Sequence, residues 1–152
     1  MTHVTRKDFY GFRMLIQELV QKTSQYEVMN RKLSAPATSI ISSMPKSQNQ
    51  TNRLEYLLNK RMDLSKKIDL LKVKITQERE TLDKAMEILN VSERTVLESR
   101  YFLLYSWDEI AGVIFESFKD FKENYEDYLQ KTRLIQTYAF KKIEGKDVRK
   151  TN

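Results

Sequence analysis

Apolar residues recur at helical intervals near the start of the chain, from Thr5 to about Leu33. The recurring apolar or neutral positions are Phe9, Phe12, Ile16, Leu19, Thr23 and Tyr26. Steps of three and four residues place them on one stripe of an α-helix, with polar side chains elsewhere. This stretch is therefore predicted to be an amphipathic helix.

A longer pattern runs from Thr51 to Asn90. Its apolar positions are Leu54, Leu57, Leu64, Ile68, Leu71, Ile75, Leu82, Ala85 and Leu89. They fit a heptad seam, which is typical of a long helix packed as a coiled coil. Arg61 and Glu78 interrupt the seam. Arg61 either sets the register of the pairing or extends its charged end into solvent.

The stretch from Ser34 to Gln50 separates these two patterns and contains both prolines, Pro36 and Pro45, with five serines. Proline lacks the backbone N–H donor and excludes a continuous helix. We interpret this stretch as a mobile loop that lets the first helix fold back antiparallel on the second. Residues 1–90 are thus predicted to form a helical-hairpin coiled coil, which is also expected to mediate homo-oligomerisation.

Two shorter helices are predicted next. Ser92 is expected to cap a helix that runs to about Leu104, because Ser is favoured at helix N-termini. Its buried face would consist of Val96, Leu97, Tyr101 and Leu104. After a break at Tyr105-Ser106, a second helix is predicted from Trp107 to about Phe115.

The start of this second short helix carries a capping signal. Ser106 is followed three residues later by Glu109, which is the pattern of a capping box. The small residue Ala111 and the adjacent Gly112 would permit close approach of another helix. A helix, a tight break and a short capped helix followed by more helix are typical of a helix-turn-helix unit. Trp107 is interpreted as a core residue rather than a stacking platform.

The stretch from Ser92 to Ile143 resembles the sigma-factor region-four-like domain of the RinA/ArpU-type late transcriptional regulators of phages. The matching segments are Glu93 to Leu97, Arg100-Tyr101, Ser106 to Ala111 and Ala139 to Ile143. An upstream coiled coil and a linker containing Met44-Pro45 are also similar to that family. The resemblance implies a DNA-binding protein, with RNA polymerase as a further partner. The absence of cysteine is compatible with a reducing cytoplasm, where the protein is expected.

One departure from the family pattern concerns the third helix of this unit. Aligning Ala139 to Ile143 with the family requires about eleven extra residues, which correspond to about three helical turns. Helical phase is then kept along the positions Phe118, Phe121, Tyr125, Tyr128, Thr132, Ile135, Ala139 and Ile143. A single long third helix, about Ser117 to Ile143, is therefore predicted. Residues 91–143 would form the helix-turn-helix-like domain, and residues 144–152 a basic flexible tail.

Charge adds a possible class of partner. The net charge is +6 and the isoelectric point about 9.4, a balance that favours polyanionic partners. It is unevenly spread over the third helix: Glu116 to Tyr128 contains five acids and two lysines, whereas Leu129 to Ile143 contains four basic residues and no acid. Only the second half is therefore expected to approach DNA.

The DNA-binding candidates are Lys131, Arg133, Gln136, Thr137, Lys141 and Lys142. Arg133 and Gln136 suit base edges, since Arg pairs with guanine and Gln with adenine. They also suit a solvated helix face. The lysines suit phosphate contacts.

Other functions lack a signal in the sequence. There is no cysteine and a single histidine, so a metal site is not expected. No glycine-rich phosphate loop or nucleophile–base pattern is present, and neither enzymatic activity nor a cofactor is predicted. No stretch reaches the roughly 18 apolar residues of a membrane span. The N-terminal residues lead into the amphipathic stretch, so no secretory signal is expected.

The fold class predicted from these patterns is all-α. The leading functional hypothesis is a phage or prophage DNA-binding transcriptional regulator. The second is an interaction protein that does not bind DNA, in which the coiled coil and the acidic stretch contact a protein partner. The third is a protein similar to small terminases, which also combine a helix-turn-helix with a coiled coil.

Overall fold

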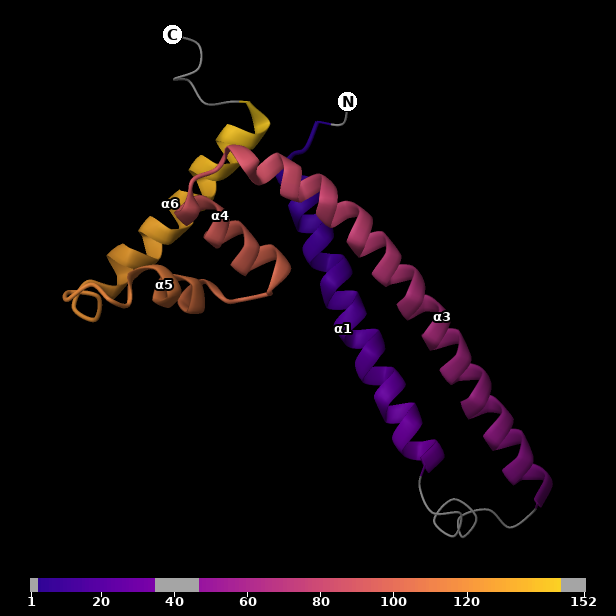
Figure 1. Ribbon diagram of the computed structural model, residues 1–152. Helices are drawn as coiled ribbons and strands as arrows, with labels where there is room; N and C mark the ends of the chain where they lie inside the picture. The colour runs from indigo at the N-terminus through magenta and orange to yellow at the C-terminus, as the bar shows by residue number, and fades with distance from the viewer. Residues whose placement is uncertain (1–2, 35–46, 146–152) are drawn as a thin grey trace. The chain divides into compact units, whose positions relative to one another are not determined.

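The computed structural model describes residues 3–34 and 47–145, and its regular structure in these ranges is entirely helical. The α-helices are α1 (Arg6–Ser34), α3 (Ser47–Ala85), α4 (Val91–Leu97), α5 (Trp107–Phe115) and α6 (Tyr125–Glu144) (Figure 1). A short 3₁₀ turn, Met86–Ile88, follows α3, and a π-helical turn, Glu98–Phe102, follows α4. The predicted all-α fold class is confirmed. No helix in the described ranges has the length and apolar character needed to cross a membrane.

The chain divides into two compact units, and both long helices contribute to each of them. The hairpin unit is Gln17–Lys74, and the core unit combines Met1–Ile16 with Ile75–Asn152. The division differs from the boundary predicted at residue 90. The reason is that Phe9 and Phe12 of α1 and Leu82 of α3 are buried in the same cluster as α4 and α6 side chains.

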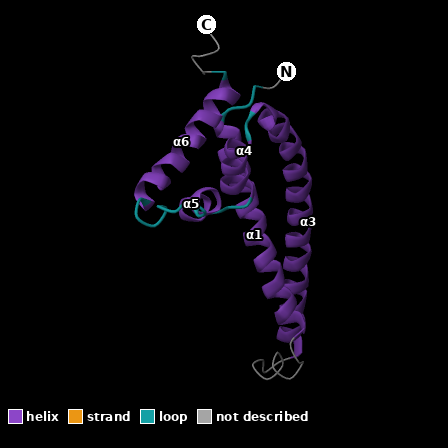
Figure 2. Ribbon diagram, turned by 60° about the vertical axis from the view of Figure 1, so that its left-hand side comes forward, coloured by secondary structure: helices purple, strands orange, loops and turns teal. Residues whose placement is uncertain are grey.

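Within the hairpin unit, the end of α1 and the start of α3 lie side by side and antiparallel in both views (Figures 1 and 2). Leu57, Leu64 and Ile68 of the predicted seam are buried. Arg61 is half-buried, and its Nη1 donates a hydrogen bond to Asn30 Oδ1 at 3.1 Å. This contact ties α3 to α1, so it favours the register-setting interpretation of Arg61.

Both ends of the range predicted as a loop, residues 34–50, are helical. Helix α3 begins at Ser47, so the last four residues of the range 34–50 are helical. Ser34 is the last residue of α1, and residues 35–46 lie outside the described residues.

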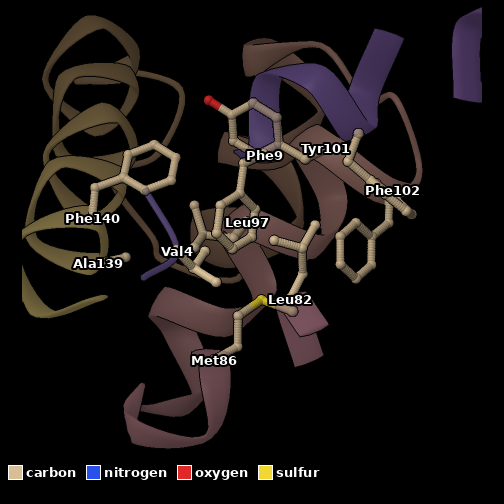
Figure 3. Close-up of a cluster of buried hydrophobic side chains, with 10 residues drawn as sticks. Val4, Phe9, Leu82, Met86, Leu97, Tyr101, Phe102, Ala139 and Phe140 are labelled. Atoms are coloured by element: carbon tan, nitrogen blue, oxygen red, sulfur yellow. The ribbon is translucent and has the colours of Figure 1, made fainter. Parts of the chain in front are cut away.

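The core unit is held together by a cluster of aromatic and aliphatic side chains from α1, α3, α4, α6, the segment before α1 and the two turns (Figure 3). Phe9 is fully buried, and its ring centroid lies 5.4 Å from that of Phe140 and 5.9 Å from that of Tyr101. All three rings meet at tilted or edge-on angles, a preferred arrangement for aromatic pairs. This cluster positions α6 against the rest of the unit.

The two short helices begin with capping boxes, one of them where it was predicted. At α5, the Ser106 hydroxyl accepts from the Glu109 N–H and the Glu109 carboxylate accepts from the Ser106 N–H, at 3.2 and 3.1 Å. At α4, the prediction of Ser92 as the cap was wrong. Asn90 occupies that position and forms the box with Glu93. Asn caps a helix as well as Ser does, and only Asn90 has a Glu three residues later.

The first short helix also ends earlier than predicted. Regular α-helix stops at Leu97, and the π-helical turn continues it to Phe102. Leu104 has a positive φ of 62°, the left-handed conformation that ends many helices. The Tyr105 N–H then donates to the Ser99 carbonyl at 2.9 Å. The break therefore spans residues 103–106, so it includes the predicted Tyr105-Ser106 and begins two residues earlier.

The prediction of one long third helix from Ser117 to Ile143 was wrong. Residues 116–124 form a series of turns, and α6 begins at Tyr125. The turns bring the Phe118 ring within 5.7 Å of the Tyr128 ring, while Phe115 and Phe121 lie 4.9 and 5.8 Å from it. In a straight helix, ten residues span about 15 Å, so Phe118 would lie far from Tyr128. Clustering of the aromatic rings outweighs the helical phase of the sequence.

The end of α6 lies beyond the predicted domain boundary. Glu144 is the last helical residue and is buried, and Gly145 follows with a positive φ of 71°. Glu144 accepts hydrogen bonds from the backbone N–H and the guanidinium of Arg6. It therefore belongs to the folded unit rather than to the predicted tail, and residues 146–152 lie outside the described residues.

Candidate nucleic-acid interface

Helix α6 carries all six residues that the sequence singled out for DNA binding. Its inner face packs against α4 and α5 and contains Tyr128, Thr132, Ala139 and Phe140, all of which are buried. The Thr132 hydroxyl donates to the Tyr128 carbonyl at 2.8 Å, so this buried polar group is satisfied within the helix. The six candidates lie at different positions around α6 relative to this inner face.

Three of the candidates share one stripe. Arg133, Thr137 and Lys141 follow each other at intervals of four residues, which places them along one side of the helix. Lys131 lies about 200° around the helix from Arg133. The structure therefore brings Arg133, Thr137 and Lys141 together as the α6 stripe and leaves Lys131 on the opposite edge.

Two candidates are engaged in contacts inside the protein. The oxygen Oε1 of Gln136 accepts a hydrogen bond from the Tyr101 hydroxyl at 2.6 Å. The Lys142 ammonium lies 2.8 Å from Glu93 Oε1, and the side chain of Glu93 is only 7% exposed. These contacts link α6 to α4 and the π-helical turn. Gln136 and Lys142 thus have structural roles in this conformation.

Three of the remaining candidates have exposed side chains beside aromatic rings. The fourth, Thr137, is half-buried, and its hydroxyl donates to the Arg133 carbonyl at 3.2 Å. Lys131 Nζ lies 4.8 Å from the centre of the Tyr128 ring, and Lys141 Nζ lies 5.9 Å from that of Tyr138. The Arg133 guanidinium lies 6.0 Å from the Trp107 ring on α5. Such cation–π contacts are weak at exposed sites, so they leave these charges available to a phosphate.

Trp107 joins Arg133 to a second basic residue. The guanidinium of Arg100 lies 4.9 Å from the Trp107 ring, and its Nη1 donates to the Tyr105 carbonyl at 3.3 Å. Arg13 of α1 donates through Nε to the Arg100 carbonyl at 3.1 Å. We call Arg13, Arg100 and Arg133 the arginine cluster. Trp107 is half-buried, so it is neither a fully buried core residue nor an open platform.

The arginine cluster is electrostatically unbalanced. Burial, followed by the charge of Arg13 and more weakly that of Arg133, lowers the pKa of the Arg100 guanidinium. Among the ion pairs in residues 3–34 and 47–145, none joins a cluster arginine to a carboxylate. Sequence reasoning missed Arg13 and Arg100, since no local pattern links positions 13, 100 and 133. Trp107, which begins a capped helix and contacts Arg100, was the sequence feature that came closest to indicating this cluster.

Two acidic residues, Asp120 of the turn segment 116–124 and Asp108 in the first turn of α5, accept hydrogen bonds from tyrosine hydroxyls. The Tyr125 hydroxyl donates to Asp108, and the Tyr128 hydroxyl donates to Asp120. Glu126 and Asp127 occupy the first turn of α6, where negative charge is favoured by the helix dipole. The same charges repel a DNA backbone. The N-terminal turn of α6 is therefore the part least suited to face phosphates.

The contact between Tyr128 and Asp120 makes a testable prediction about the turn segment. The hydrogen bond from Tyr128 is the largest cause of the lowered pKa of Asp120. In Tyr128→Phe, the pKa of Asp120 is expected to rise toward its ordinary value of 3.8, because the donor to the ionised form is lost. Carbon-detected NMR titration of the carboxyl groups measures the change.

The lowered pKa of Asp120 makes the stability of the folded protein depend on pH. Ionised Asp120 contributes stability above pH 3.8, and this contribution is lost as the pH falls through the folded-state value. Tyr125→Phe is the matched control, since it removes the bond to Asp108 and leaves the bond to Asp120 intact. Equal titration of Asp120 in both variants would contradict the prediction.

Comparison with protein-family models, curated proteins and solved structures returns no match for the chain. The resemblance to the RinA/ArpU-type regulators therefore stays a prediction from the sequence. Within the described part of the chain, no three His, Asp or Glu side chains gather in a way that could hold a metal ion.

Proposed function

We propose that this protein binds double-stranded DNA through the α6 stripe and acts as a transcriptional regulator of the phage or prophage type. The observation that carries the proposal is the stripe itself. Arg133 and Lys141 are exposed and form no ion pair with the described residues, and the stripe lies on a helix packed against the capped helix α5.

The orientation of α6 follows from its charges. Its acidic first turn would lie away from the duplex, and the half that follows would approach the major groove. The guanidinium of Arg133 and the ammonium of Lys141 both suit phosphates of the duplex backbone. Arg133 also suits a guanine edge, to which a guanidinium can donate two hydrogen bonds. The net charge of +6 supports long-range attraction to the duplex. RNA polymerase would be a further partner, as the resemblance implies.

Fluorescence anisotropy with a labelled mixed-sequence duplex of about 30 base pairs tests this function. Arg133→Gln with Lys141→Gln is expected to raise the Kd by about tenfold or more, because each such contact contributes about 1–3 kcal/mol. The slope of log K against log salt is expected to fall by about 1.8, since each lost phosphate contact changes it by about 0.9.

The matched control is Lys66→Gln with Lys67→Gln, two exposed residues of α3 in the hairpin unit. It removes the same net charge and is expected to change the Kd by less than about threefold, because these exposed lysines belong to the other unit and not to the α6 stripe. Lys131→Gln tests the opposite edge of α6 and is expected to have a similarly small effect. Equal losses in the double variant and in the control, or no binding by the wild type at low salt, would contradict the proposal.

A second candidate function is protein interaction without DNA binding. The turn segment and the end of α5 support it, since Val113 and Phe118 are exposed beside the acidic residues of the segment. A protein with this function would fail to bind the duplex at any salt concentration. A ring-sized oligomer by light scattering would instead favour a role similar to small terminases.

A further inference from the structure

The arginine cluster brings together three positive charges from three separate parts of the core unit. Arg13 belongs to α1, Arg100 to the π-helical turn and Arg133 to α6. Like charges held close together repel each other, and the repulsion grows as water is excluded. The fold nevertheless holds Arg100 and Arg133 beside the Trp107 ring and Arg13 on the Arg100 carbonyl. No carboxylate is paired to any of the three among the described residues.

Hydrogen bonds to the backbone hold two of these guanidiniums in place. A guanidinium carries five N–H donors. Arg13 uses one of them for the Arg100 carbonyl, and Arg100 uses one for the Tyr105 carbonyl. Most of the donors of the cluster therefore have no acceptor among the described residues. The contact of Arg100 with the Trp107 ring, at 4.9 Å, further orients its planar group.

The chemistry of the cluster fits a phosphate group. Planar guanidiniums match phosphate oxygens through pairs of parallel hydrogen bonds. Several cations around one site favour an anion that presents oxygens in several directions, as a tetrahedral phosphate does. The cluster also shares Arg133 with the α6 stripe, so a phosphate bound there would lie beside the surface that approaches the duplex.

We infer that Arg13, Arg100 and Arg133 form a phosphate-binding site beside Trp107, which takes a backbone phosphodiester of the bound duplex. The assignment to the duplex rests on the proposed function, whereas the phosphate chemistry does not. Arg13 and Arg100 hold the phosphate next to the major groove and set how α6 enters it. Phosphate contacts of this kind fix register and orientation without reading sequence.

Thermal unfolding of the full chain with inorganic pyrophosphate tests the site, with chloride used to keep the ionic strength constant. Pyrophosphate at tenfold its Kd is expected to raise the Tm of the wild type by about 3–5 °C. Arg13→Gln and Arg133→Gln are expected to lose most of this rise. Arg31→Gln, an exposed residue of α1 in the hairpin unit, is the control and is expected to keep it.

Folding of the variants is checked separately by circular dichroism without pyrophosphate. Arg133 is exposed, so Arg133→Gln keeps the test valid if Arg13→Gln fails to fold. An equal rise of Tm in the wild type, the cluster variants and the control would overturn the site, and so would the absence of any rise in the wild type.

Duplex binding by the same variants distinguishes the source of the phosphate. Arg13→Gln is expected to raise the Kd for the duplex about tenfold and to lower the salt slope by about 0.9. If the wild type binds the duplex but Arg13→Gln binds it equally well, the assignment to the DNA backbone is overturned. If the wild type binds no duplex, the proposed function fails, and the pyrophosphate measurement still decides whether the phosphate site exists.

Discussion

Replacement of Phe140 by alanine is expected to lower the free energy of unfolding of the core unit by about 4 kcal/mol. The side chain is only 1% exposed. Its ring contacts those of Phe9 and Tyr101, with centroids 5.4 and 5.8 Å apart. The substitution leaves a cavity among residues that come from several helices, so the surrounding structure cannot close it easily. Such cavities account for much of the cost of large-to-small substitutions in cores.

Urea denaturation followed by Trp107 fluorescence measures the effect, because the protein has one tryptophan and it lies in the core unit. Tyr138→Ala is the matched control, since Tyr138 is an aromatic residue of the same helix that is 49% exposed. Its loss is expected to cost less than about 1 kcal/mol. A cost below about 1.5 kcal/mol for Phe140→Ala would show that this cluster does not hold α6 in place.

The second large effect is expected from Glu144→Ala, which should cost about 2 kcal/mol. The carboxylate is 3% exposed and accepts from the Arg6 backbone N–H at 2.9 Å and from its guanidinium at 3.2 and 3.3 Å. It therefore satisfies a backbone donor at the N-terminus of α1 from the far end of the chain. The Arg6 side chain is 43% exposed, so water can solvate it in the variant, and the cost is lower than for a fully buried pair.

A double-mutant cycle with Arg6→Gln separates the ion pair from the capping of α1. Arg6→Gln keeps the backbone N–H that Glu144 accepts, so it is expected to cost less than Glu144→Ala. The coupling energy between the two positions reports the side-chain pair alone. Equal costs for the two single variants would show that the backbone hydrogen bond contributes nothing.

The helical elements could be predicted from sequence where a single strong pattern decided them. The stripe from Phe9 to Tyr26 lies in α1, because burying such a stripe requires helical geometry. The seam from Leu54 to Leu89 lies in α3 as far as Ala85, although Leu54 is exposed and Leu89 follows the 3₁₀ turn. The capping box of Ser106 and Glu109 was also predicted, since it needs only residues three apart. The start of α4 was missed because Asn90 and Ser92 are both good caps, and the choice depended on where Glu93 lies.

The turn segment marks the limit of reasoning from periodicity. Phe118, Phe121 and Tyr128 keep helical phase in the sequence, yet the chain turns through residues 116–124. A periodic pattern predicts which side chains will be buried, but it does not predict which other segment of the chain will cover them. In the folded unit, these rings pack on one another, and the turns that permit this packing replace about two and a half turns of helix.

The candidate interface shows the same division. By itself, the sequence determined that the protein is helical, that it is basic, and that the positive charge of its last helix lies after Tyr128. Only the tertiary structure separated Arg133, Thr137 and Lys141 from Lys131 on the opposite edge and from Gln136 and Lys142, which contact Tyr101 and Glu93. It alone brought Arg13 and Arg100 to Arg133, because proximity among residues 13, 100 and 133 arises from the packing of α1, the π-helical turn and α6. Periodicity and local charge act within a few residues, whereas contacts between distant segments depend on how the whole unit buries its core.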